Sequence, residues 1–163
     1  MSDKSAQPTH ERRLHDQVNL ATPDGARLNP DAVGWSSAPL HRANLRGSWG
    51  RNKRWDYWAV LAGDLVVAAT FADIDYLGIA DVYWVDLATG STGGAAAASP
   101  LGRGLELPER PGTAPLTFHH KRLDLTMDDP DDGTTIISAR WTESDGSPAE
   151  LEAQIALPDG HES

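Results

Sequence analysis

The chain has no cysteine among its 163 residues, which excludes disulfides, thiol catalysis and cysteine-ligated metals. It also has no apolar run that approaches the roughly 20 residues of a membrane-spanning helix. The first residues, Met1 to Pro8, lack the apolar core of a secretory signal peptide. We therefore expect a cytoplasmic protein with no membrane span.

Motifs of several large protein classes are missing as well. The chain contains no GxGxxG, no Walker loop and no GxSxG, so nucleotide-dependent chemistry and serine hydrolysis are poorly supported. The adjacent pair His119-His120 would point to opposite faces of a strand, which disfavours a shared metal. The acidic run Asp128–Asp132 lacks the spacing of a calcium loop and is typical of a solvated turn. We expect no cofactor and no metal.

Positive charge is scarce, because 14 lysines and arginines stand against 24 acidic residues and give a formal net charge of −10. Such a surface repels phosphate backbones, so we expect no nucleic-acid partner. The segment Arg46–Arg54 is the exception, because it forms a local basic patch in an acidic protein. A patch of this kind indicates either an ion-pair network or a site.

Turn residues alternate with short apolar segments through most of the chain, which is typical of an antiparallel β protein. The segments predicted as strands are 55–62, 65–72, 79–87, 93–99, 116–127, 134–142 and 150–157. The 116–127 segment changes phase, which we interpret as a bulge near His119-His120. Seven or eight strands in one domain predict a barrel or a sandwich. We expect a flexible arm over 1–28, with a short helix from Thr9 to Val18, a β-barrel-like domain over 29–160 and a tail over 161–163.

The strands differ in how many apolar faces they have. In the last strand, Leu151, Ala153 and Ile155 alternate with polar residues, which predicts one buried face and one wet face. The segments 55–62 and 65–72 are apolar on both faces, and such strands need a cover on both sides. A lid, a partner or a second domain would supply the second cover.

Tryptophan and charge are concentrated between Trp35 and Tyr76, which is the candidate functional region. Strand alternation would place Asp73 and Asp75 on one face, where they converge on Arg51 or Arg54. The cluster is then a structural ion-pair network, an anion site, or the polar floor of a pocket in which one carboxyl stays protonated. The rings either fill the core or wall a ligand cavity. The candidate ligand-binding residues are Trp35, His41, Trp49, Arg51, Arg54, Trp55, Trp58 and Tyr76, and the candidate catalytic acids are Asp73 and Asp75.

The decamer Trp49-Gly-Arg-Asn-Lys-Arg-Trp-Asp-Tyr-Trp58, with the flanking runs 29–36, 39–45 and 72–76, resembles the bacterial family known as domain of unknown function 2804. The resemblance covers about residues 17–160 and corresponds to the N-terminal half of the family's usual length. The family is more distantly similar to lipocalin-like two-barrel proteins such as carotenoid hydratase and tocopherol cyclase. The resemblance implies a lipocalin-like (calycin) barrel, or half of a two-barrel protein.

Three functions fit these observations. The first is binding of a hydrophobic small molecule, a lipid or an isoprenoid, in the β-barrel. The second is an acid-catalysed isoprenoid-modifying enzyme, similar to a hydratase or cyclase, with Asp73 or Asp75 as proton donor. The third is a structural half-domain that pairs with a second half, another chain or another copy of itself.

Overall fold

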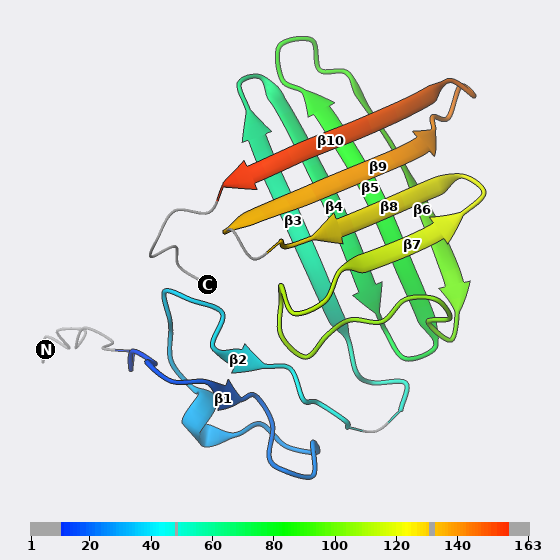
Figure 1. Cartoon of the computed structure of the whole chain (residues 1–163). Helices are drawn as coiled ribbons and strands as arrows, with labels where there is room; N and C mark the ends of the chain where they lie inside the picture. The colour runs from blue at the N-terminus through cyan, green and yellow to red at the C-terminus, as the bar shows by residue number, and fades with distance from the viewer. Residues whose placement is uncertain (1–10, 48, 131–132, 157–163) are drawn as a thin grey trace, which may run out of the picture.

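The computed structural model describes residues 11–47, 49–130 and 133–156. Its elements are β1 Val18–Asn19, η1 Pro30–Ala32, β2 His41–Arg42, β3 Arg54–Ala62, β4 Leu65–Asp73, β5 Leu77–Asp86, β6 Thr92–Pro100, β7 Leu116–His120, β8 Leu123–Asp128, β9 Thr134–Thr142 and β10 Pro148–Ala156. Strands β3–β6 form one four-stranded antiparallel sheet and β7–β10 form another (Figure 1). The predicted all-β antiparallel fold is confirmed. Within the described residues, strands β3–β10 form two separate four-stranded sheets, which is a half-barrel-like arrangement.

Short connections explain why both sheets keep the order of the chain. The loop Gly63-Asp64 joins β3 to β4, and the flanking residues Ala62 and Leu65 pair directly. Gly63 adopts a φ of 63°, which glycine reaches without steric cost. The predicted weak strand of small residues is confirmed as β6, which pairs with β5 along its length.

The segment 116–127 is two strands, and the prediction of one bulged strand was wrong. His120 pairs with Leu123, so Lys121 and Arg122 form the loop of a tight hairpin. The change of phase comes from the reversal of the chain, which places Phe118 opposite Leu125 with both side chains buried. No glycine or asparagine marks this turn, so the pattern of turn residues gave no signal for it.

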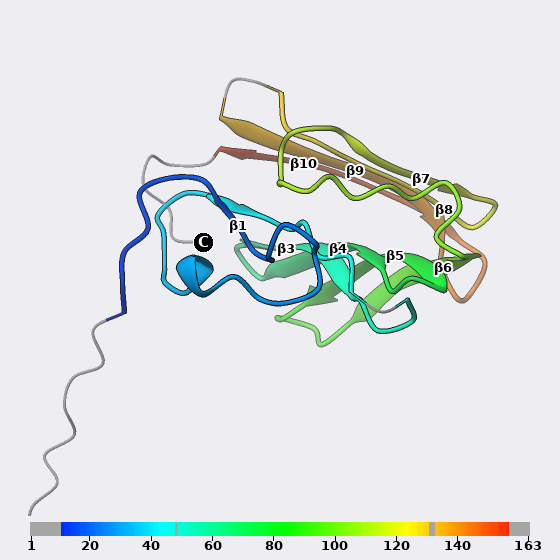
Figure 2. The same cartoon turned by 90° about the horizontal axis from the view of Figure 1, so that it is seen from below.

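The two sheets are stacked as layers, and their strands cross at a steep angle (Figures 1 and 2). Between them lies a core in which Phe71 and Leu125 are fully buried. The void bounded by Val60, Ala69 and Ile137 is too small to admit water. The space between the sheets at this point is therefore filled by side chains and offers no room for a ligand.

The N-terminal segment forms the parallel pair β1–β2 and runs beside one end of the two sheets (Figures 1 and 2). In the region predicted as a flexible arm, Leu14 and Ala21 are buried, at 7% and 1% exposure. The helix predicted from Thr9 to Val18 is wrong for its described part, because residues 11–18 are not helical. Instead, the Leu14 amide donates to the Trp35 carbonyl at 2.8 Å. Among the described residues, no helix is long and apolar enough to cross a membrane.

The two outer faces differ in chemistry. On β10, Leu151, Ala153 and Ile155 pack against the core while the residues between them are exposed, so the predicted one-sided strand is confirmed. On the other sheet, Trp55 and Leu61 of β3 point outward and are 65% and 73% exposed. The first sheet thus has an apolar outer face as well as an apolar inner face.

Candidate binding groove

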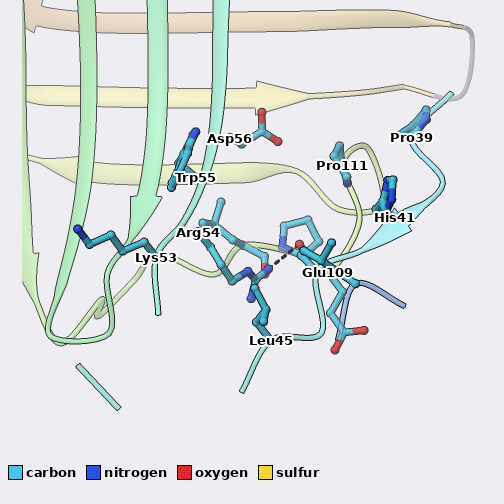
Figure 3. A pocket seen from close by; sticks show the side chains of 13 residues that line it. Pro39, His41, Leu45, Lys53, Arg54, Trp55, Asp56, Glu109 and Pro111 are labelled. Atoms are coloured by element: carbon cyan, nitrogen blue, oxygen red, sulfur yellow. Dashed lines mark hydrogen bonds between the residues drawn. The ribbon is translucent and has the colours of Figure 1, made fainter. Parts of the chain in front are cut away.

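An apolar groove lies where the N-terminal segment meets the start of β3 (Figure 3). It has a volume of about 360 Å³ and lies outside the space between the sheets. Its apolar walls come from three parts of the chain: Leu20, Pro39, Ala43, Leu45, Trp55, Leu107, Pro108 and Pro111. A cavity of this size is at the lower end of the roughly 300–1,000 Å³ typical of small-molecule sites.

Arg54 fixes one wall of the groove by holding the 105–111 loop. Its Nη2 donates to the carbonyl oxygens of Leu107 at 2.6 Å and Pro108 at 2.7 Å (Figure 3). On the other side, the Ala43 amide donates to the Glu109 carbonyl at 2.6 Å. The loop is therefore attached both to β3 and to the segment after β2, and the groove between them has fixed walls.

Two basic residues, His41 and Lys53, contribute to the lining in different ways. The His41 ring Nε2 lies 2.9 Å from the Ala32 carbonyl, which is within hydrogen-bond distance. Lys53 makes no ion pair with any residue that the structure describes. The Lys53 side chain contributes to the lining but points away from His41 and Pro111 (Figure 3).

Asp56 is the acid whose environment suits proton transfer. Its partial burial raises the pKa of the Asp56 carboxyl, and the nearby charge of Asp129 raises it further. A hydrogen bond from the Trp58 side chain acts in the opposite direction but does not cancel these effects. Asp56 is not among the candidate catalytic acids predicted from the sequence. The sequence pattern could have indicated its burial, because side chains alternate between faces along a strand and Asp56 lies on the same, inner face as Trp58.

Asp75 does not share a strand face with Asp73, and the expected geometry was wrong. β4 ends at Asp73, and Asp75 lies in the following turn with a φ of 68°. Its Oδ2 accepts from the Gly50 amide at 2.6 Å and from the Asn52 amide at 3.1 Å. The carboxylate thus binds backbone donors of the basic segment and not its guanidinium groups.

The protonation of Asp75 also differs from that of an acid catalyst. Desolvation acts to raise the pKa of Asp75, but hydrogen bonds from Asn52, Gly50 and Arg51 outweigh it and lower the pKa. Asp73 accepts from the Asp75 amide at 2.9 Å and so stabilises the same turn. Among the described residues, neither aspartate forms an ion pair with Arg51 or Arg54.

The eight predicted ligand-binding residues fall into two groups. The structure brings His41, Arg54 and Trp55 together in the groove. The other five lie elsewhere: Trp35 stacks under Arg13, whose Cζ is 5.0 Å from the ring centroid, Trp58 packs on the core, and Trp49, Arg51 and Tyr76 are exposed. The tryptophan-rich region therefore serves several local structures, and one of them is the groove.

The fold and the groove together define a class: a protein of two stacked antiparallel sheets with a preformed apolar groove beside one of them. The sequence model of the family described as Domain of unknown function (DUF2804) matches residues 11–163, and the chain belongs to this family. The family resemblance drawn from the Trp49–Trp58 string is thereby confirmed. Neither the search of curated proteins nor the search of solved structures found a match.

Proposed function

We propose that this protein binds a hydrophobic small molecule, of the lipid or isoprenoid class, in the groove beside Trp55. The observation that carries the proposal is the groove itself, which is largely apolar and has walls fixed by Arg54. The filled space around Val60 and Ile137 favours the groove over the interior of the fold as the binding site. Removing apolar surface from water supplies roughly 25 cal/mol per Å² of affinity before the costs of binding.

The polar groups at the groove favour an amphipathic ligand. Trp55 offers an exposed indole face, and Lys53 offers an ammonium group without an ion-pair partner among the described residues. The apolar part of the ligand would lie along the proline and leucine wall, and an acidic or hydroxylated head group would extend past Trp55 toward Lys53.

Binding of decanoate and of geraniol, measured by calorimetry, tests the proposal on two probes of this class. We expect Trp55→Ala to weaken binding about tenfold, which corresponds to ~1.4 kcal/mol. Trp49→Ala is the matched control, because Trp49 is 71% exposed and does not line the groove. The proposal fails if neither probe binds and mass spectrometry of the purified protein finds no bound lipid. It also fails if the two variants lose affinity equally.

A second candidate function is acid catalysis on such a ligand, with Asp56 as proton donor. The raised pKa of Asp56 at an apolar groove favours it, and it replaces the roles first considered for Asp73 and Asp75. Incubation with an acyclic isoprenoid alkene tests it: the wild type should form a hydrate or a cyclic isomer, and Asp56→Asn should bind the alkene without converting it.

A further inference from the structure

The outer face of the β3–β6 sheet exposes large apolar side chains. The exposed fractions are 65% for Trp55, 56% for Tyr57, 73% for Leu61 and 48% for Tyr83. Figure 2 shows the two sheets as layers, and no described segment forms a third layer on this side. Apolar patches of more than a few hundred Å² are uncommon on monomers and mark interaction surfaces.

Charge separates this face from the rest of the molecule. The strand register places one carboxylate on it, that of Asp81, which accepts from the Thr70 hydroxyl at 3.1 Å. The outer face of the second sheet carries Asp124, Arg140 and Glu150 instead. The centre of a protein interface is depleted in charge and enriched in aromatic residues. In a chain of net charge −10, a nearly uncharged face is also the one where two copies repel least.

The side chains on this face differ in size between its two edges. The rings of Trp55 and Tyr57 rise from β3, whereas β6 presents Ala98 and Ala96. The register links these residues in rows across the sheet: Trp55 pairs with Ala72, then Ile79, then Ala98, and Tyr57 pairs with Thr70, then Asp81, then Ala96. In these two rows the β3 edge therefore carries the large side chains and the β6 edge carries the small ones.

We propose that two copies of this chain pack face to face through the outer sides of their β3–β6 sheets, about a twofold axis that runs along the strands between β4 and β5. This axis places β3 of one copy over β6 of the other. The ring of Tyr57 then lies over the partner copy's small β6 side chains. Large side chains of one copy therefore meet small side chains of the other on both sides of the axis. The same rotation places Thr70 of one copy opposite Asp81 of the other. The two Asp81 carboxylates lie away from the axis and so do not face each other.

The area is enough for a weak but specific dimer. Four strands spaced about 4.8 Å apart and nine residues long give a face of roughly 500 Å² per copy. Two copies would bury about 1,000 Å², which is the lower limit for a specific interface. We expect an equilibrium between monomer and dimer that depends on concentration.

Analytical ultracentrifugation between ~1 and ~200 µM tests the proposal. The expected result is a shift toward twice the 17.5 kDa of one chain as the concentration rises. Leu61→Lys should abolish this shift, because it places a charge on the face. Gln154→Lys adds the same charge at an exposed position on β10 and should leave the shift unchanged. A monomer at all concentrations, or equal effects of the two variants, would overturn the proposal.

Cross-linking tests the direction of the axis. The chain has no cysteine, so any cross-link must form between the introduced cysteines and shows which positions face each other. Sheets that pack face to face lie about 10 Å apart, which is too far for a disulfide but suits a short bismaleimide. The double variant Tyr57→Cys/Ala96→Cys should give cross-linked dimers in high yield, whereas each single variant should give few. Efficient cross-linking of Tyr57→Cys alone would contradict the placement of β3 over β6.

Discussion

The Oε1 atom of Glu143 lies 2.8 Å from Nε1 of Trp84, and this bond joins the two sheets. Trp84 belongs to β5 of the first sheet, while Glu143 follows β9 of the second. The same oxygen accepts from Trp141 Nε1 at 2.8 Å, and Oε2 accepts from the Gly94 amide at 2.9 Å. One carboxylate thus receives three donors at the corner where the sheets meet.

Replacing Glu143 should destabilise the protein without affecting the groove. In Glu143→Ala, the indole N–H groups of Trp84 and Trp141 lose their charged acceptor. We expect a loss of about 1–3 kcal/mol in the free energy of unfolding, measured by urea denaturation. Glu152→Ala on the exposed face of β10 is the control and should change the unfolding free energy by less than about 0.5 kcal/mol. Equal stabilities of the two variants would show that the corner bonds contribute nothing.

The same carboxylate should make stability depend on pH in the acid range. Hydrogen bonds from Trp84, then from Gly94 and Trp141, lower the pKa of Glu143 against an opposing effect of desolvation. A lowered pKa means that the contribution is complete above the ordinary glutamate value of about 4.3 and is lost as pH falls through the folded value. The difference in unfolding free energy between wild type and Glu143→Gln should therefore shrink below about pH 4.3. A difference that stays constant there would contradict the assignment.

Asp75 should act as a structural clamp on the loop before β3. Asp75→Asn keeps the size of the side chain but removes the charge that attracts the amides of Gly50 and Asn52. We expect both amides to exchange with solvent several times faster, as measured by hydrogen exchange with NMR detection, while amides at the centre of β9 keep their protection. Unchanged exchange at Gly50 and Asn52, or loss of ligand binding with unchanged exchange, would argue for a functional role instead.

Asp56 should destabilise the fold when it is ionised. Because burial, and then the charge of Asp129, raise its pKa, the folded state disfavours the carboxylate. Stability is then lost as pH rises from the ordinary aspartate value of about 3.9 through the folded value. Asp56→Asn should unfold at a higher temperature than wild type at pH 7, and the gain should vanish in acid. Asp64→Asn in the exposed β3–β4 turn is the control, and an equal gain there would reflect net charge alone.

Local rules recovered the strands of the two four-stranded sheets but missed one chain reversal and the short elements before β3. Alternation and turn residues located the hairpins around Gly63 and the one-sided strand β10, because these signals act between neighbours along the chain. The loop Lys121-Arg122 has no such residue, so its hairpin was interpreted as a bulge. Alternation also fails beyond the last residue of a strand, which is why it misplaced Asp75 relative to Asp73.

The sequence by itself determined that the protein is an antiparallel β protein of the DUF2804 family, that thiol chemistry is absent, and that the segments of β3 and β4 are apolar on both faces. Only the tertiary structure decided that the pKa of Asp56, at the groove, is raised while that of Asp75 is lowered, and that the groove lies beside the sheets. The physical reason is that strand patterns depend on adjacent residues. The pKa of a carboxyl and the walls of a groove depend instead on burial by segments such as the 105–111 loop, which lies about fifty residues away in the chain.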